Sequence, residues 1–78
     1  MYEVQPLDDL VAVPSDLLPA LAELGAALEV SPLTVGRPYV RSNPSGMRVV
    51  SFGQGRALLV FGVSEQERMV WLFDLVVL

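Results

Sequence analysis

The sequence predicts an α+β domain in which an N-terminal strand and a helix pack on a C-terminal three-stranded antiparallel meander. Three runs rich in Val, Leu, Phe and Trp lie near 47–53, 56–63 and 68–77, joined by short connectors of Gly and polar residues. Such a succession is typical of antiparallel strands. Leucines recur every three or four residues over Ser15–Val30, the spacing of a helix that covers a sheet. All 78 residues are expected to form a single domain.

The chain is expected to begin with a short strand at Tyr2–Gln5, which Pro6 ends and which joins the sheet. The next segment, Leu7–Val13, is compatible with one or two helical turns before Pro14 stops them.

The main helix is expected at Ser15–Val30. Either Ser15 or Asp16 can cap its N-terminus, because both side chains accept hydrogen bonds from free backbone N–H groups. Pro19 is tolerated in the first turn, and Ser31-Pro32 ends the helix. An apolar stripe along one side is formed by Leu17, Leu21, Leu24 and Leu28.

Residues 31–46 are expected to be a connector, since they contain three prolines and two glycines. It is long for a loop without secondary structure, and such loops are often functional. The connector carries Arg37 and Arg41, and Asn43 begins a predicted turn.

The connector Gly53–Gly55 is expected to be a three-residue hairpin loop, so that Arg48 faces Val60. Arg48 and Arg56 then share one face of the sheet. That face would also carry Val50, Phe52, Leu58, Met69, Trp71 and Phe73.

The second connector, Ser64–Glu67, is expected to be a four-residue loop that places Trp71 beside Val60. Asp74 would lie near Ser51 and Ala57 on the opposite face, either as a buried polar contact or as a catalytic base. A β-bulge would move every later residue to the other face. Both faces are largely apolar and one helix covers only one, so we expect the second face to bind a protein partner or a second copy of the chain.

The composition restricts the chemistry, because the sequence contains no Cys, His or Lys. Without them there is no imidazole base, thiolate nucleophile, Schiff-base amine or soft-metal ligand. We therefore expect no cofactor and no metal. All five basic residues are arginines, which suit bidentate contacts to phosphate or carboxylate.

The net charge is −4, which argues against sequence-independent binding of nucleic acid. Residues 1–36 hold six acids and no base, whereas residues 37–78 hold five arginines and three acids. Any site for a polyanion is therefore expected in the second half. The N-terminus has no basic leader, and no apolar run approaches the ~18 residues of a membrane span, so we expect a cytoplasmic protein without a membrane partner.

Several landmarks resemble the RelE/ParE superfamily of type II toxins. They are Leu21-Ala22-Glu23-Leu24 with the stop at Ser31-Pro32, the connector Gly36-Arg37-Pro38-Tyr39, and the strand start Gly46-Met47-Arg48-Val49-Val50. The stretch Asn43–Arg48 with Phe52-Gly53 is most similar to short actinobacterial members.

The resemblance implies a toxin that a cognate antitoxin holds inactive. RelE-like members are endoribonucleases that cleave mRNA on the ribosome, and ParE-like members inhibit DNA gyrase. By this resemblance Arg48 and Arg56 are the catalytic candidates, and Arg37, Arg41 and Asn43 would contact nucleic acid or an acidic partner. RelE-like toxins are strongly basic and this chain is not, so weak or absent cleavage is expected. A non-catalytic protein-interaction module is the alternative.

Simpler interpretations of the same residues stay open. Arg48 and Arg56 can be strand-end charges that limit edge pairing, and Arg37 and Arg41 can be solvated loop residues. Arg68 is expected to form an ion pair with Glu65 or Glu67, which precede it in the turn.

Overall fold

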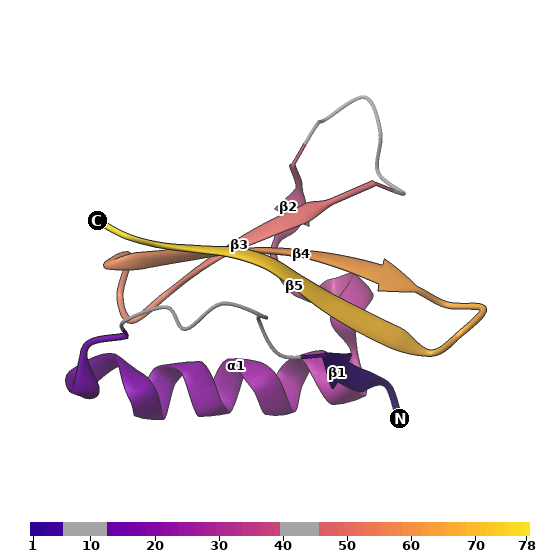
Figure 1. Ribbon diagram of the computed structural model, residues 1–78, viewed down its shortest axis with the longest axis horizontal. Coiled ribbons are helices and arrows are strands. Elements are labelled where there is room, and N and C mark those ends of the chain that lie inside the picture. The colour runs from indigo at the N-terminus through magenta and orange to yellow at the C-terminus, as the bar shows by residue number, and fades with distance from the viewer. Residues whose placement is uncertain (6–12, 40–45) are drawn as a thin grey trace.

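The computed structural model describes residues 1–5, 13–39 and 46–78. They form one α-helix and a five-stranded mixed sheet in the order β1-β5-β4-β3-β2 (Figure 1). The elements are β1 (Glu3–Gln5), the 3-10 turn η1 (Ser15–Leu17), α1 (Leu18–Val30), the 3-10 turn η2 (Pro32–Thr34), β2 (Arg37–Pro38), β3 (Arg48–Phe52), β4 (Ala57–Ser64) and β5 (Met69–Val77). The α+β class is confirmed, whereas a three-stranded meander understates the sheet.

The helix lies along one face of the sheet, as Figure 1 shows. Its predicted span is confirmed, with the first turn tightened into η1, Pro19 near the start of α1 and the end at Ser31. The predicted side-chain cap is wrong, because neither η1 nor α1 has a capping hydrogen bond from a side chain. Asp16 instead contacts the loop between β3 and β4.

The N-terminal strand pairs with β5 in parallel, and Val4 lies opposite Val70. This confirms that the first residues join the sheet. The helical turns predicted for Leu7–Val13 lie outside the described residues, except for Val13.

The connector contains a strand that was not predicted. Arg37 and Pro38 of β2 pair with Val49 and Arg48 of β3. A two-residue strand has no alternation to detect, and its proline suits an edge strand because no ladder hydrogen bond is lost there.

The predicted pairing of β3 with β4 is wrong by one residue. Phe52 faces Ala57, so the loop has four residues, Gly53–Arg56, and Arg48 faces Phe61 rather than Val60. The loop has φ values of 62° at Gly53, 59° at Gln54 and 83° at Gly55, which close it over four positions. Side chains alternate between the two faces along each strand. A shift of one residue therefore changes which residues of β3 and β4 lie on the same face of the sheet.

The pairing of β4 with β5 is shifted by two residues from the prediction, which preserves the faces. Ser64 lies opposite Met69, so the loop is Glu65–Arg68. Met69 and Trp71 therefore share a face with Val60, as predicted.

A β-bulge at Phe73 then reverses the alternation in β5. Phe61 pairs with Leu72 and Val60 pairs with Asp74, so Phe73 has no partner in the ladder. Beyond the bulge Leu75 turns toward the helix and is buried. Asp74 is exposed on the opposite face, where its Oδ1 accepts a hydrogen bond from the N–H of Leu75. Its predicted position near Ala57 is therefore wrong, whereas Ser51 does share a face with Asp74.

The core lies between the helix and the sheet. Its buried members come from η1, α1 and the three longest strands: Leu17, Leu24, Leu28, Phe52, Ala57, Leu59, Phe61, Val70 and Leu75. Leu21, the remaining residue of the predicted stripe, packs against this cluster. Within residues 1–5, 13–39 and 46–78, no helix has the length and apolar character needed to cross a membrane.

Candidate functional site

Arg48, the first residue of β3, is a buried arginine that binds backbone oxygens. Its side chain is on the helix side of the sheet and the residue is 9% exposed. Nε donates a hydrogen bond to the carbonyl of Val35 and Nη2 donates one to the carbonyl of Gly36, both at 3.2 Å. These bonds hold the segment that follows α1 against β3.

Gly36 makes this approach possible. Its φ is +69°, and a Cβ atom there would lie 2.3 Å from the carbonyl oxygen of Val49. A residue with a side chain would be strained and would also clash with the backbone of β3. Arg48 and Gly36 therefore act together to position β2.

Arg56, the last residue of the β3–β4 loop, forms an ion pair with Asp16 of η1. The two side chains are 52% and 59% exposed, so the pair lies in water. Arg48 is the first residue of β3, and Arg56 lies in the loop beyond its last residue, so the length of β3 alone separates them by about 13 Å at ~3.3 Å per residue. The structure does not bring the two catalytic candidates together.

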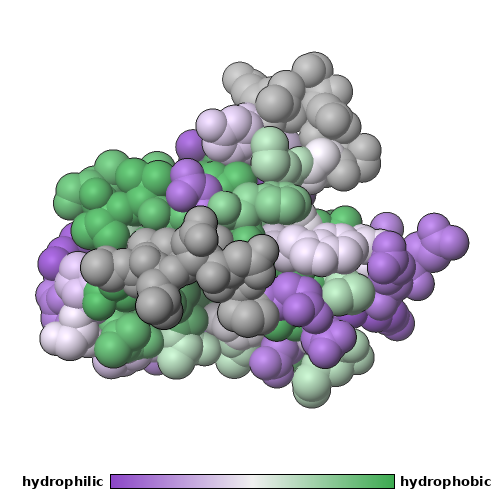
Figure 2. All heavy atoms as spheres, viewed as in Figure 1, coloured by the Kyte–Doolittle hydropathy of each residue, from purple (hydrophilic) through white to green (hydrophobic). Residues whose placement is uncertain are grey.

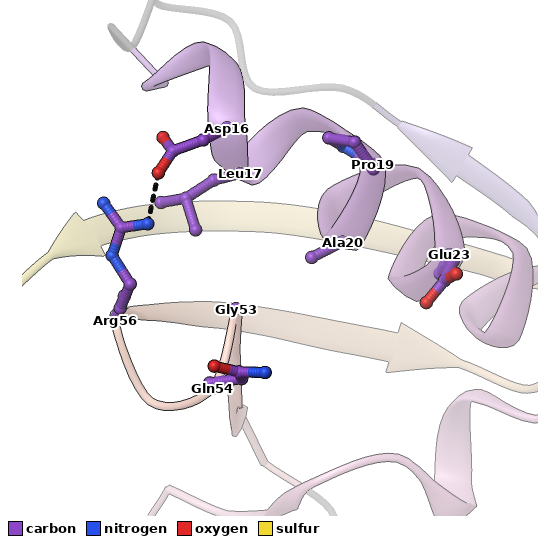
Figure 3. A pocket seen from close by; sticks show the side chains of 8 residues that line it. All are labelled: Asp16, Leu17, Pro19, Ala20, Glu23, Gly53, Gln54 and Arg56. Atoms are coloured by element: carbon purple, nitrogen blue, oxygen red, sulfur yellow. Dashed lines mark hydrogen bonds and ion pairs between the residues drawn. The ribbon is translucent and has the colours of Figure 1, made fainter.

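Figure 3 shows an open cleft beside Arg56, between the start of α1 and the β3–β4 loop. The cleft has a volume of about 540 Å³ and is lined by Asp16, Leu17, Pro19, Ala20, Glu23, Gly53, Gln54 and Arg56. Its charged groups are two carboxylates and one guanidinium, so the cleft does not attract phosphate. Leu17 packs tightly on the loop, because a Cβ at Gly53 would lie 2.4 Å from Leu17 Cδ2.

Arg56 donates a hydrogen bond to Asp16 and so holds the pKa of that carboxyl below its ordinary value. A pKa lowered in the folded state contributes stability above the ordinary Asp pKa, and this contribution is lost as the pH falls through the lowered pKa. In Arg56→Gln we expect the pKa of Asp16 to rise toward its ordinary value, as followed by an NMR titration. Arg68→Gln, at the other loop, is the control and should leave it unchanged. An unchanged pKa in Arg56→Gln would contradict the pairing.

The other predicted contact residues do not converge on this cleft. Arg37 is exposed on β2, and Arg41 and Asn43 lie outside the described residues. The predicted ion pair of Arg68 is wrong, because Arg68 forms none with Glu65 or Glu67. Its guanidinium carbon lies 5.0 Å from the centre of the Tyr2 ring, a cation–π arrangement that no spacing in the sequence indicates.

The face of the sheet opposite the helix is largely apolar, and we call it the outer face. Val49 belongs to it, because it lies opposite Val60 and alternates with Arg48 and Val50, which are on the helix side. Val49 is only 8% exposed. Phe73 also belongs to it, because its ring lies against Gly62. Apolar residues on this face are Val49, Leu58, Val60, Met69, Trp71, Phe73 and Val76.

Part of the outer face is open to solvent. Phe73 is 52% exposed and Val76 is 40% exposed, while Val60 and Trp71 are half-buried. Figure 2 shows hydrophobic residues gathered over the C-terminal end of β5, at the upper left of the view. Exposed large apolar side chains that cluster in this way commonly mark interaction sites.

In the part of the chain that the structure describes, no three carboxylates converge on a point that a metal ion could occupy. Comparisons with protein-family models, curated proteins and solved structures found no match. The positions of the arginines and the outer face are therefore the observations that bear on function.

Proposed function

We propose that this chain is a toxin-like component of the RelE/ParE type that acts by binding protein rather than by cleaving RNA. The observation that carries the proposal is the outer face of the sheet, where aromatic and aliphatic side chains are exposed opposite the helix. Covering such a face with another protein removes apolar area from water, which is the main driving force of association.

The contacts of the two catalytic candidates support a role without cleavage. Arg48 binds two backbone carbonyls and is nearly inaccessible, so it is poorly placed to stabilise the developing charge of a reacting phosphate. Arg56 is accessible, but Asp16 neutralises it.

The charge of the molecule supports the same view. The chain carries a net charge of −4, and the cleft beside Arg56 adds Glu23 to the Asp16–Arg56 pair. A polyanion such as the ribosome or mRNA is repelled by such a surface.

Induced expression in a bacterial host tests the catalytic alternative. We expect growth and amino-acid incorporation to match those of cells without the protein, for both the wild type and Arg56→Ala. A translation arrest caused by the wild type and abolished in Arg56→Ala would overturn the proposal.

Site-specific cross-linking tests the protein-binding role. A photoreactive phenylalanine analogue at position 73 should give a protein adduct in cells, because Phe73 is exposed on the outer face. The same analogue at position 26, an exposed site on α1, is the control and should give none. Absence of an adduct from position 73 would contradict protein binding through this face.

A further inference from the structure

A cross-strand row on the outer face has opposite charges at its two ends. Arg37 faces Val49 across β2 and β3, Val49 faces Val60, and Val60 faces Asp74 on β5. Directly opposed residues of neighbouring strands point to the same side of a sheet. From β2 to β5 the row therefore consists of a positive residue, two apolar residues and a negative residue.

The two charged ends cannot neutralise each other within one chain. Three strand spacings of ~4.8 Å separate Arg37 from Asp74, which puts them about 14 Å apart. Both residues are exposed. A second copy of the row, laid against the first in the opposite direction, would therefore place each charged end against a residue of opposite charge.

We propose that the outer face is the interface of a two-fold symmetric dimer of this chain, which deepens the protein-binding role proposed above by naming its partner. The symmetry axis would lie between the two stacked sheets and run along the strands, midway between β3 and β4. A half-turn about it exchanges the ends of the row. Arg37 then meets Asp74 of the partner subunit, as a self-complementary interface requires. Val60, which is half-buried, approaches Val49 of the partner subunit, which is 8% exposed and adds little to the contact.

The rest of the face fits this arrangement. Trp71 and Phe73 lie on β5 beside the row, and partly exposed aromatic side chains are the usual anchors of an interface. Glu3, the acidic residue of β1, faces Met69 near the far end of β5. In the dimer β5 stacks on β2 of the partner subunit, so the edge strand β1 projects past the partner's sheet. Glu3 therefore lies outside the area where the two sheets overlap.

The size of the face indicates a weak dimer. Strands β2 to β5 present roughly 19 Å by 20 Å at ordinary strand spacings, about 400 Å² of flat area per copy. Specific interfaces bury about 800 Å² of accessible surface per partner. Side chains make the accessible area of the face larger than its flat area, but the face is still at the low end of the size range of specific interfaces. We expect a dissociation constant in the micromolar range.

Sedimentation equilibrium over about 1 µM to 500 µM protein tests the dimer at the affinity expected. The single tryptophan, Trp71, supplies a second readout, because its emission should shift to the blue with the same midpoint as the outer face is covered. A chain that stays monomeric over this range would overturn the proposal. If the adduct from position 73 then has the mass of a complex with a different protein, the proposed protein binding through the outer face is supported and only the proposed dimer is wrong.

Charge exchange tests the symmetry. Arg37→Asp and Asp74→Arg should each weaken the dimer about tenfold or more, since each sets like charges against each other. An equal mixture of the two variants should regain wild-type affinity, because every contact in the mixed dimer then pairs opposite charges. The double variant R37D/D74R should regain it alone.

Circular dichroism should show native folding for all three variants, since both positions are exposed. Single variants that dimerise like the wild type, or a mixture that fails to recover, would overturn the two-fold geometry.

Discussion

Replacing Arg48 by methionine is expected to lower the free energy of unfolding by about 2–4 kcal/mol, because two hydrogen bonds from a charged donor are lost. The carbonyls of Val35 and Gly36 lose those partners. Methionine is similar in length and adds no branching, so the loss reports the polar contacts rather than a cavity. Urea denaturation of both proteins, analysed with a common slope, measures the difference.

Arg56→Met is the matched control. It removes the same guanidinium from a pair whose side chains are about half exposed, and exposed ion pairs contribute little to stability, so the loss should be much smaller than that of Arg48→Met. Equal losses of unfolding free energy from the two substitutions would contradict the view that Arg48 makes buried hydrogen bonds whereas Arg56 makes only a surface ion pair.

Substitutions of Arg48 and Arg56 therefore differ in what they report about catalysis. An Arg48 variant that loses a biological effect has also lost stability, and a small domain has little to spare. We expect Arg56 variants to keep the fold, because the pair with Asp16 is exposed, so they are the proper test of catalysis.

Replacing Phe61 by alanine is expected to lower the free energy of unfolding by about 3–5 kcal/mol, the usual cost of emptying a buried aromatic site. Phe61 is 0% exposed and belongs to the helix-side core. A domain of this length has a total stability of roughly 4–12 kcal/mol. The variant should therefore be partly or wholly unfolded near room temperature, as thermal denaturation followed by circular dichroism would show.

Phe73→Ala is the control for the same residue type. Phe73 is 52% exposed at the bulge on the outer face, so its loss should change the stability of the monomer by less than about 1 kcal/mol. The measurement belongs at a protein concentration below the dimer dissociation constant. Comparable losses at positions 61 and 73 would contradict the assignment of the two faces.

The long elements were predictable from the sequence because their patterns repeat often enough to be distinguished. The helix follows from leucines spaced over about three turns and from the proline after Ser31. Strands β4 and β5 follow from long runs of β-branched and aromatic residues. By contrast, β2 has two residues, too few for any periodicity.

The candidate site was less predictable, because it depends on contacts between residues distant in sequence. The sequence indicates that Arg56 is a basic residue near a turn, but its partner Asp16 is 40 positions away and has the local context of a helix cap. The sequence also places Arg48 on a strand, and no local pattern indicates that it binds the carbonyls of Val35 and Gly36.

By itself, the sequence determined the fold class, the helix with its buried stripe, and the existence of two apolar sheet faces. The tertiary structure decided which residues occupy each face, because one extra loop residue at Arg56 and one bulge at Phe73 each invert a two-residue alternation. Those two local events place Asp74 in line with Val60, Val49 and Arg37 on the outer face. Periodicity specifies alternation along a strand, whereas backbone conformation in the loops sets its phase.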